Sequence, residues 1–113
     1  GLWLMIYGVE VSEQADSDLR EIFEYIAFEL QSPEIASRQL NRLEKHILSL
    51  DTMPKCYQKY EKEPWKSRGL RVLPVDNYVV LYIPDSNKKV VTILRVMYAG
   101  RDIDNQLNLH TKQ

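Results

Sequence analysis

Cysteine and glycine are scarce in this sequence of 113 residues, which contains one cysteine and four glycines. A single cysteine, Cys56, cannot close a disulfide within the chain, so the fold does not depend on one. We interpret Cys56 as an inert loop thiol, because no base is recognisable beside it. The glycines, at positions 1, 8, 69 and 100, lack the spacing of a phosphate-binding loop, which excludes the common nucleotide motifs.

Histidine is also rare, and His46 and His110 lie 64 positions apart with no cysteine or acidic residue at ligand spacing. We therefore expect no metal centre and no cofactor. A serine triad is disfavoured as well, since neither histidine has a recognisable nucleophile and orienting acid around it.

Long apolar runs are absent. The longest, residues 2–7, is far shorter than the roughly 18 to 20 residues that span a bilayer, and it lacks the basic start and cleavage site of a signal peptide. We expect a cytoplasmic protein with no membrane partner, folded as a single domain over residues 1–113. Met5 is a candidate for the native start, which would make residues 1–4 an extension.

Charge is distributed unevenly along the chain, although the net charge is only −1. Residues 1–51 contain four basic and ten acidic residues, a net charge of −6, whereas residues 52–113 contain eleven basic and six acidic residues, a net charge of +5. A basic face favours polyanions or an acidic protein segment. The alternative is a solvated dipolar surface without a partner.

Hydrophobic periodicity in the first half predicts a strand over residues 5–11 and then two helices. Ser12 is the expected N-cap of the first helix, whose core stripe consists of Leu19, Ile22, Phe23, Ile26 and Leu30. Ser32 and Pro33 begin the second helix, whose stripe consists of Ala36, Leu40, Leu43, Ile47 and Leu50. Facing apolar seams predict an antiparallel helical hairpin over about residues 12–50.

The second half begins with residues 51–67, which show no clear period and predict a long loop with a functional role. Strands are expected at about 70–75, 78–83 and 90–98, the last of them apolar on both faces like a central strand. The predicted fold class is α+β. The N-terminal strand and this three-stranded antiparallel segment form a four-stranded, mostly antiparallel sheet, and the hairpin covers one of its faces.

Arginines and tyrosines on these apolar strands are the candidate functional residues, namely Arg68, Arg71, Tyr78, Tyr82, Arg95, Tyr98 and Arg101. A ribonuclease that works without a metal needs cations to hold charge on the phosphate and a proton donor for the leaving oxygen. Arginine and tyrosine supply these groups.

A structural alternative explains the same residues. Arg71 and Arg95 would then form ion pairs with aspartates of the second half, the candidates being Asp76, Asp102 and Asp104. Tyr78 and Tyr82 lie on one face of their strand and would belong to the core.

The order of short motifs resembles the RelE/ParE family of toxins from bacterial toxin-antitoxin pairs. In the first half, the residues that carry the resemblance are Tyr7, Val9, Ser12, Ala15, Leu19, Ile22, Tyr25, Ile26, Leu50 and Pro54. In the second half they are Gly69, Arg71, Tyr78, Val80, Tyr82, Arg95, Val96, Tyr98, Arg101 and Asp102. The resemblance covers the chain from Met5 to Leu107.

The resemblance implies a growth-arresting toxin that a cognate antitoxin holds inactive, with operator DNA bound only through the antitoxin. RelE-type members cleave mRNA on the ribosome, and ParE-type members poison DNA gyrase. If the chain is a ribonuclease, the catalytic candidates are Arg71, Tyr98 and Arg101. The candidates for binding RNA or another target are Lys66, Arg68, Arg71 and Arg95.

Departures from the RelE pattern favour ParE-type action. No tyrosine follows Arg101 or His110, and the N-terminal half is acidic, unlike ribonucleases that approach ribosomal RNA. A ribosome-dependent mRNA endoribonuclease is the alternative, and a non-catalytic binding domain is a third. A homodimer and a heterotetramer with the antitoxin both remain open.

Overall fold

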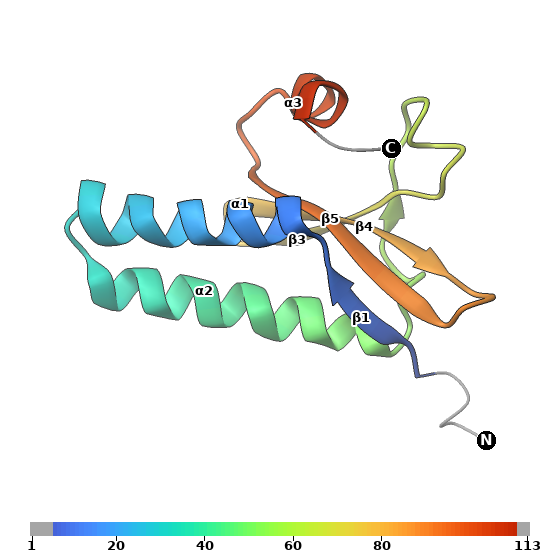
Figure 1. Cartoon of the computed structure of the whole chain (residues 1–113), viewed down its shortest axis with the longest axis horizontal. Helices are drawn as coiled ribbons and strands as arrows, with labels where there is room; N and C mark the ends of the chain where they lie inside the picture. Colours follow the sequence, from blue (N-terminus) through green and yellow to red (C-terminus); the bar gives the residue numbers. More distant parts are fainter. Residues whose placement is uncertain (1–5, 111–113) are drawn as a thin grey trace.

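The structure of the protein is a computed structural model that describes residues 6–110 (Figure 1). Its elements are, in order, β1 (Gly8–Val11), α1 (Glu13–Glu24), the π-helix η2 (Tyr25–Glu29), α2 (Pro33–Leu48), the 3₁₀ turn η3 (Ser49–Asp51), β2 (Gln58–Lys59), β3 (Arg71–Val75), β4 (Tyr78–Asp85), β5 (Val90–Tyr98) and α3 (Ile103–His110). The proposed start at Met5 and the residues before it lie outside the described range. None of the helices within that range is long and apolar enough to cross a membrane.

The strands form one mixed sheet in the order β1-β5-β4-β3-β2. β1 runs parallel to β5, and the other neighbours are antiparallel. The predicted α+β class is confirmed, with one correction to the strand count. The loop predicted over residues 51–67 contains the two-residue strand β2, which pairs with Val72 and Arg71 of β3 and makes the sheet five-stranded.

The helical hairpin is also confirmed, because both apolar seams face inward. Ser12 caps α1, its hydroxyl accepting a hydrogen bond from the Ala15 amide at 3.1 Å. The same hydroxyl donates to the Leu94 carbonyl at 3.0 Å, which fixes the start of the helix on β5. On α2, Leu43 and Ile47 are buried against the sheet.

One predicted core residue is exposed. Leu30 is 54% exposed because η2 follows α1 and interrupts the helical period. The Leu30 amide bonds to the Tyr25 carbonyl, five residues back, at 3.1 Å. The wider π-helical turn rotates the following side chains away from the core stripe.

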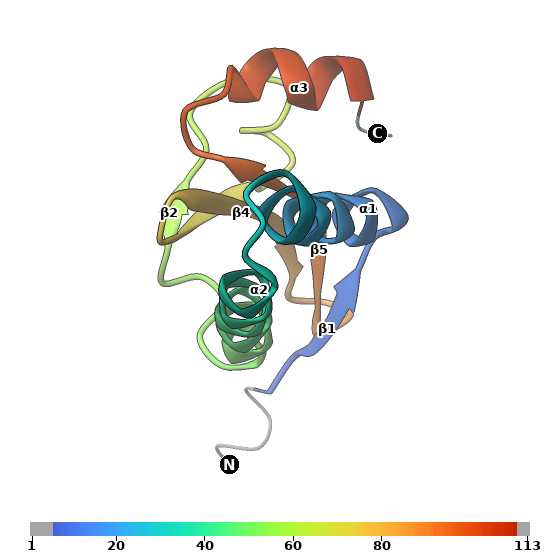
Figure 2. The same ribbon diagram turned by 90° about the vertical axis from the view of Figure 1, so that its left-hand side faces the viewer.

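The sheet is packed on both faces. On one face, the hairpin covers a core that includes Val80, Tyr82 and Ile93. On the other face, α3 and the segment around Trp65 cover a second cluster that includes Leu81 and Leu107 (Figure 2). Tyr82 is therefore a core residue, as the structural alternative predicted, and Tyr78 packs against the same core.

Candidate functional site

An open groove of about 830 Å³ lies between the hairpin and the C-terminal end of β5. Its lining includes Tyr25, Leu30, Ile35, Tyr78, Tyr98 and Arg101. We call it the apolar groove, because its lining is mainly aliphatic and aromatic. Tyr25, Leu30 and Ile35 each expose more than half of their surface.

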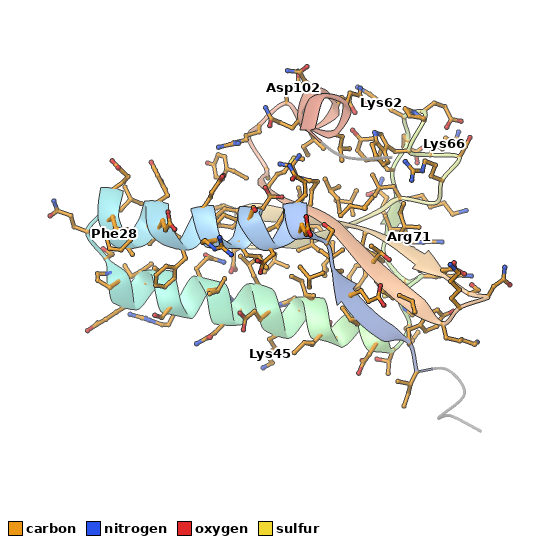
Figure 3. The ribbon with its side chains drawn as sticks, viewed as in Figure 1. Phe28, Lys45, Lys62, Lys66, Arg71 and Asp102 are labelled. Atoms are coloured by element: carbon orange, nitrogen blue, oxygen red, sulfur yellow. The ribbon has the colours of Figure 1, made fainter. Side chains whose placement is uncertain are left out.

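The end of the hairpin extends this apolar surface beyond the sheet. Phe28 of η2 is 70% exposed and lies at the end of the hairpin (Figure 3). Clustered exposed side chains of this size mark sites of interaction in soluble proteins. The π-helix is part of the cause, because it places Tyr25, Phe28 and Leu30 outside the core.

The opposite wall of the groove is held by aromatic packing. The rings of Tyr78 and Tyr98 meet edge to face, with centroids 6.0 Å apart. The Tyr98 ring also lies on Gly100, where an added Cβ atom would come within 2.8 Å of the ring. A side chain at position 100 would therefore displace Tyr98 and change the groove.

Arg95 lies at the floor of the groove and is bound to Asp18 of α1. Its guanidinium donates to both carboxylate oxygens of Asp18, at 2.7 and 3.0 Å, and to the Gln106 carbonyl of α3 at 3.3 Å. Asp18 also accepts a hydrogen bond from the Val96 amide at 3.0 Å. The pair thus connects α1, β5 and α3 in the interior.

Two expectations for Arg95 change as a result. Its ion-pair partner is Asp18 and not one of the three aspartates considered from the sequence. Arg95 is only 6% exposed, so it does not share a surface with the other arginines predicted to bind a target. The signal for Asp18 was present in the sequence, since it lies three residues after Ala15 and four before Ile22, on the buried face of α1.

Arg71 also has a structural contact that differs from the expected one. Its guanidinium donates to the carbonyls of Lys55 and Tyr57, at 3.1 and 2.8 Å, and so fixes the segment before β2. The expected partner Asp76 instead binds Arg42 of α2, at 2.8 Å between the Arg42 Nε and Oδ2 atoms. Hydrogen bonding from Arg42 holds the pKa of Asp76 below its usual range.

Lys66 and Arg68 are exposed in a series of turns between β2 and β3. The Glu63 carboxylate accepts hydrogen bonds from the Ser67 hydroxyl and amide, at 2.6 and 2.8 Å, which lower the pKa of Glu63. Trp65 is buried beneath the turns, and the Arg68 guanidinium lies 4.9 Å from the centre of its ring. We call residues 55–71 the basic loop.

A second hollow, of about 430 Å³, lies between β2 and the start of α3. Its lining includes Lys59, Lys62, Val72, Arg101 and Asp104. Asp104, another expected partner of Arg71 and Arg95, binds Lys62 at 2.5 Å and also the hydroxyl of Tyr60. The lining also includes Glu61 and Asp102, so its acidic and basic residues are equal in number. We call it the basic hollow after Lys59 and Arg101, the two cations there that form no ion pair within the described residues.

The three catalytic candidates are not brought together. In the sheet register, Arg71 lies opposite Tyr82 in the middle of β4, whereas Tyr98 lies opposite Tyr78 at the start of β4. Four residues along a strand correspond to roughly 13 Å. Arg101 is close to Tyr98, its amide bonding to the Tyr98 carbonyl at 3.1 Å. Within residues 6–110, no three His, Cys, Asp or Glu side chains are grouped closely enough to hold a metal ion.

Tyr82 anchors the start of the basic loop and gives a testable pH dependence. Its hydroxyl donates to the Pro54 carbonyl at 2.6 Å, and burial raises the pKa of Tyr82. The unfolded chain releases this proton near pH 10 and the folded chain keeps it, so the stability present below about pH 10 should fall as the pH rises further.

Urea unfolding of the wild type and of Tyr82→Phe between pH 8 and 11 tests this expectation. The two proteins differ only in this hydroxyl, so the difference between their two slopes isolates Tyr82. The decline should be shallower in the variant, and equal slopes would refute the assignment.

Solved structures with this arrangement define the class of the fold. A chain of the chromosomal ParDE toxin-antitoxin system from Pseudomonas aeruginosa matches with a TM-score of 0.69 and 18% identity, covering 83% of this chain and 97% of that one. A chain of the Mycobacterium tuberculosis toxin-antitoxin complex RelBE2 matches with a TM-score of 0.63 and 21% identity, covering 82% and 98%. A free mutant of the Escherichia coli toxin RelE gives a TM-score of 0.64 and 17% identity, covering 90% and 93%. The chain therefore has the RelE/ParE toxin fold.

The particular family follows from the sequence. Residues 9–103 match the model of the ParE toxin of the type II toxin-antitoxin system, parDE. The chain belongs to this ParE toxin family, and the resemblance of its motifs to RelE/ParE toxins is confirmed. A search of the curated proteins finds no match.

Proposed function

We propose that the protein arrests growth by binding and poisoning DNA gyrase, and that a cognate antitoxin keeps it inactive. Family membership over residues 9–103 is the observation that carries the toxin assignment. The separation of Arg71 from Tyr98 supports binding over cleavage. The carbonyl contacts of Arg71 support the same choice, because they use the cation that a ribonuclease would direct at a phosphate.

The basic loop and the basic hollow are the proposed target-contacting surface. Lys66, Arg68, Lys59 and Arg101 are exposed there, and Trp65 and the Glu63–Ser67 contacts fix the loop that carries the first two. A preformed cationic surface lowers the conformational cost of binding an acidic partner.

The apolar groove is the proposed antitoxin site. Several structures that share the fold are toxin-antitoxin complexes, including the RelE-RelB complex from Pyrococcus horikoshii. The groove joins exposed aromatic and aliphatic side chains of the hairpin to the end of β5 and the start of β4. Such a groove accepts one apolar face of an amphipathic segment. We propose that operator DNA is bound through the antitoxin, since the hairpin half of the toxin is acidic.

Expression with and without the antitoxin tests the assignment. Induced expression of the toxin alone should arrest growth, and coexpression of the small protein encoded beside it should restore growth. Ile35→Ser in the groove should escape this rescue, because loss of a central apolar contact typically lowers affinity by about tenfold or more.

Ile6→Ser is a matched control for Ile35→Ser. Both isoleucines are 53% exposed, but Ile6 does not line the groove. Calorimetric titration of the purified pair should show weaker antitoxin binding for Ile35→Ser alone. The mass of the free toxin tests for a homodimer, and the mass of the complex tests for a heterotetramer. Equal antitoxin affinities for the two variants would show that the antitoxin does not bind in the apolar groove.

A RelE-like mRNA endoribonuclease is the second candidate function. It is supported by the adjacency of Tyr98 and Arg101, which would place a proton donor beside a cation. The likeness to the E. coli RelE fold supports the same candidate.

A further inference from the structure

Arg101 occupies a position that no other charged residue of the described chain shares, because it lines both the apolar groove and the basic hollow. The side chain is exposed, and residues 6–110 supply no carboxylate partner for it. It lies in the turn between β5, which ends at Tyr98, and α3, which begins at Ile103; Figure 1 shows this connection. One guanidinium can therefore reach two separate surfaces.

The backbone around Arg101 is fixed on both sides. The Ala99 amide bonds to the Asn77 carbonyl at 2.8 Å, and the Tyr98 ring packs on Gly100. On the other side, the Asp102 carboxylate accepts a hydrogen bond from the Asn105 amide at 3.3 Å and so caps α3. Asp102 is therefore engaged with the helix, and the turn presents Arg101 between the two surfaces.

The distance between the two surfaces makes this position important. Phe28 at the hairpin end and Lys66 in the basic loop lie at opposite ends of the long axis of the molecule (Figure 3). A short segment that fills the apolar groove would leave Lys66 and Arg68 uncovered. If an antitoxin bound in the apolar groove is to inactivate the toxin, it must contact a residue that also belongs to the target-contacting surface.

We propose that Arg101 is this residue: a carboxylate of the antitoxin binds its guanidinium from the apolar groove and removes it from the target-contacting surface. This inference rests on the proposed function of the two surfaces. An acidic group of the occupant matches Arg101 in charge, because the other cation of the groove, Arg95, is bound to Asp18, and Glu21 of the same lining forms no ion pair with Arg101. Arginine binds carboxylates through two parallel hydrogen bonds, and such contacts are among the stronger polar ones at an interface.

Arg101→Ala tests whether Arg101 serves both surfaces, because the replacement should weaken antitoxin binding and toxicity together. The dissociation constant of the antitoxin should rise by about tenfold or more, the scale expected for loss of a hydrogen bond to a charged group. Toxicity without antitoxin should fall, since Lys59 remains as the one cation of the basic hollow that is not ion-paired within the described residues. Arg101→Lys should recover part of each loss, because it restores the charge but not the planar fork.

Matched variants separate this effect from a general loss of structure. Arg20→Ala removes an exposed arginine of α1 outside both hollows and should leave both readouts unchanged. Lys59 lines the basic hollow but not the apolar groove, so Lys59→Ala should lower toxicity more than it lowers antitoxin affinity. Ile35 lines the apolar groove but not the basic hollow, so Ile35→Ser should lower antitoxin affinity more than it lowers toxicity. Thermal melting of each variant confirms that the fold is kept.

The outcomes show whether Arg101 contacts both the antitoxin and the target or only one of them. If Arg101→Ala changes only antitoxin affinity or only toxicity, with the fold kept, Arg101 serves one surface and the proposal is wrong. A failure of the proposed function looks different, because the wild-type chain would then neither arrest growth nor bind the antitoxin. Loss of the Arg101 contribution to antitoxin affinity at high salt further supports a charge contact.

Discussion

Replacing Asp18 with alanine should lower the free energy of unfolding by about 3 to 5 kcal/mol, the usual cost of removing one partner of a buried ion pair. Asp18 accepts three hydrogen bonds, two from Arg95 and one from the Val96 amide. Its removal leaves the buried guanidinium without its carboxylate and the Val96 amide without an acceptor. Because small domains are stable by only about 5 to 15 kcal/mol, urea unfolding should detect a much weakened protein.

Asp16→Ala is the control for Asp18→Ala. Asp16 lies on the same helix and pairs with Arg20 at 3.1 Å, but both side chains are more than 60% exposed. Exposed pairs contribute less than about 1 kcal/mol, so this variant should unfold near the wild-type urea concentration. Similar losses in the two variants would show that burial does not set the strength of the Asp18 contact.

A double replacement separates the stability lost by breaking the Asp18–Arg95 pair from the stability that the intact pair contributes. Asp18→Leu combined with Arg95→Met removes both charges and fills similar volume, so it should recover much of the stability lost in Asp18→Ala. The double variant still lacks an acceptor for the Val96 amide, and full recovery is therefore not expected.

The sequence was sufficient where a periodic pattern spans several turns or strands. The stripes of α1 and α2 repeat at three and four residues, and burial of Leu43 and Ile47 follows from that spacing. β5 was predicted with its observed bounds, because its apolar residues occupy both faces and the chain turns before it. The Ser12 cap was found from residue type and position alone.

The sequence was insufficient where tertiary contacts decide the local structure. β2 is two residues long and exists through its pairing with β3. α3 is short and is held by the burial of Leu107 against the sheet and by contacts of Asp104 with the basic loop. Neither signal can be read from a local window, and the exposure of Leu30 likewise depends on a single π-helical turn.

The candidate site was recovered only in part for the same reason. Exposed Lys66 lies on the predicted loop and exposed Arg68 directly follows it, but the partners of Arg71 and Arg95 could not be chosen by sequence distance. Asp18 and Arg95 are 77 positions apart, and Arg71 binds backbone carbonyls that carry no residue-specific signal. The apolar groove was also missed, because it combines the hairpin end with the turn after β5.

Induced expression should produce DNA breaks and a damage response, without new codon-phased mRNA ends. This result is expected because Arg71 and Tyr98 are four residues apart in the sheet register and the Arg71 guanidinium is bound to backbone carbonyls, so the groups needed to cut RNA do not converge. Sequencing of mRNA ends and measurement of DNA breaks in the same arrested cells compare the two activities directly. With purified components, linear plasmid should accumulate only when both the toxin and gyrase are present.

Tyr98→Phe provides the sharpest control for the ribonuclease alternative. The phenyl ring keeps the edge contact with Tyr78 and the packing on Gly100, so a binding function loses at most one hydrogen bond. A ribonuclease that uses the Tyr98 hydroxyl as its proton donor would instead slow by roughly 10² to 10⁴. Arg101→Ala would slow such an enzyme by roughly 10² to 10³, the cost of removing a charge-stabilising group. Codon-phased cuts that disappear in Tyr98→Phe would overturn the gyrase proposal, whereas growth arrest with neither cuts nor breaks would favour a non-catalytic binding domain.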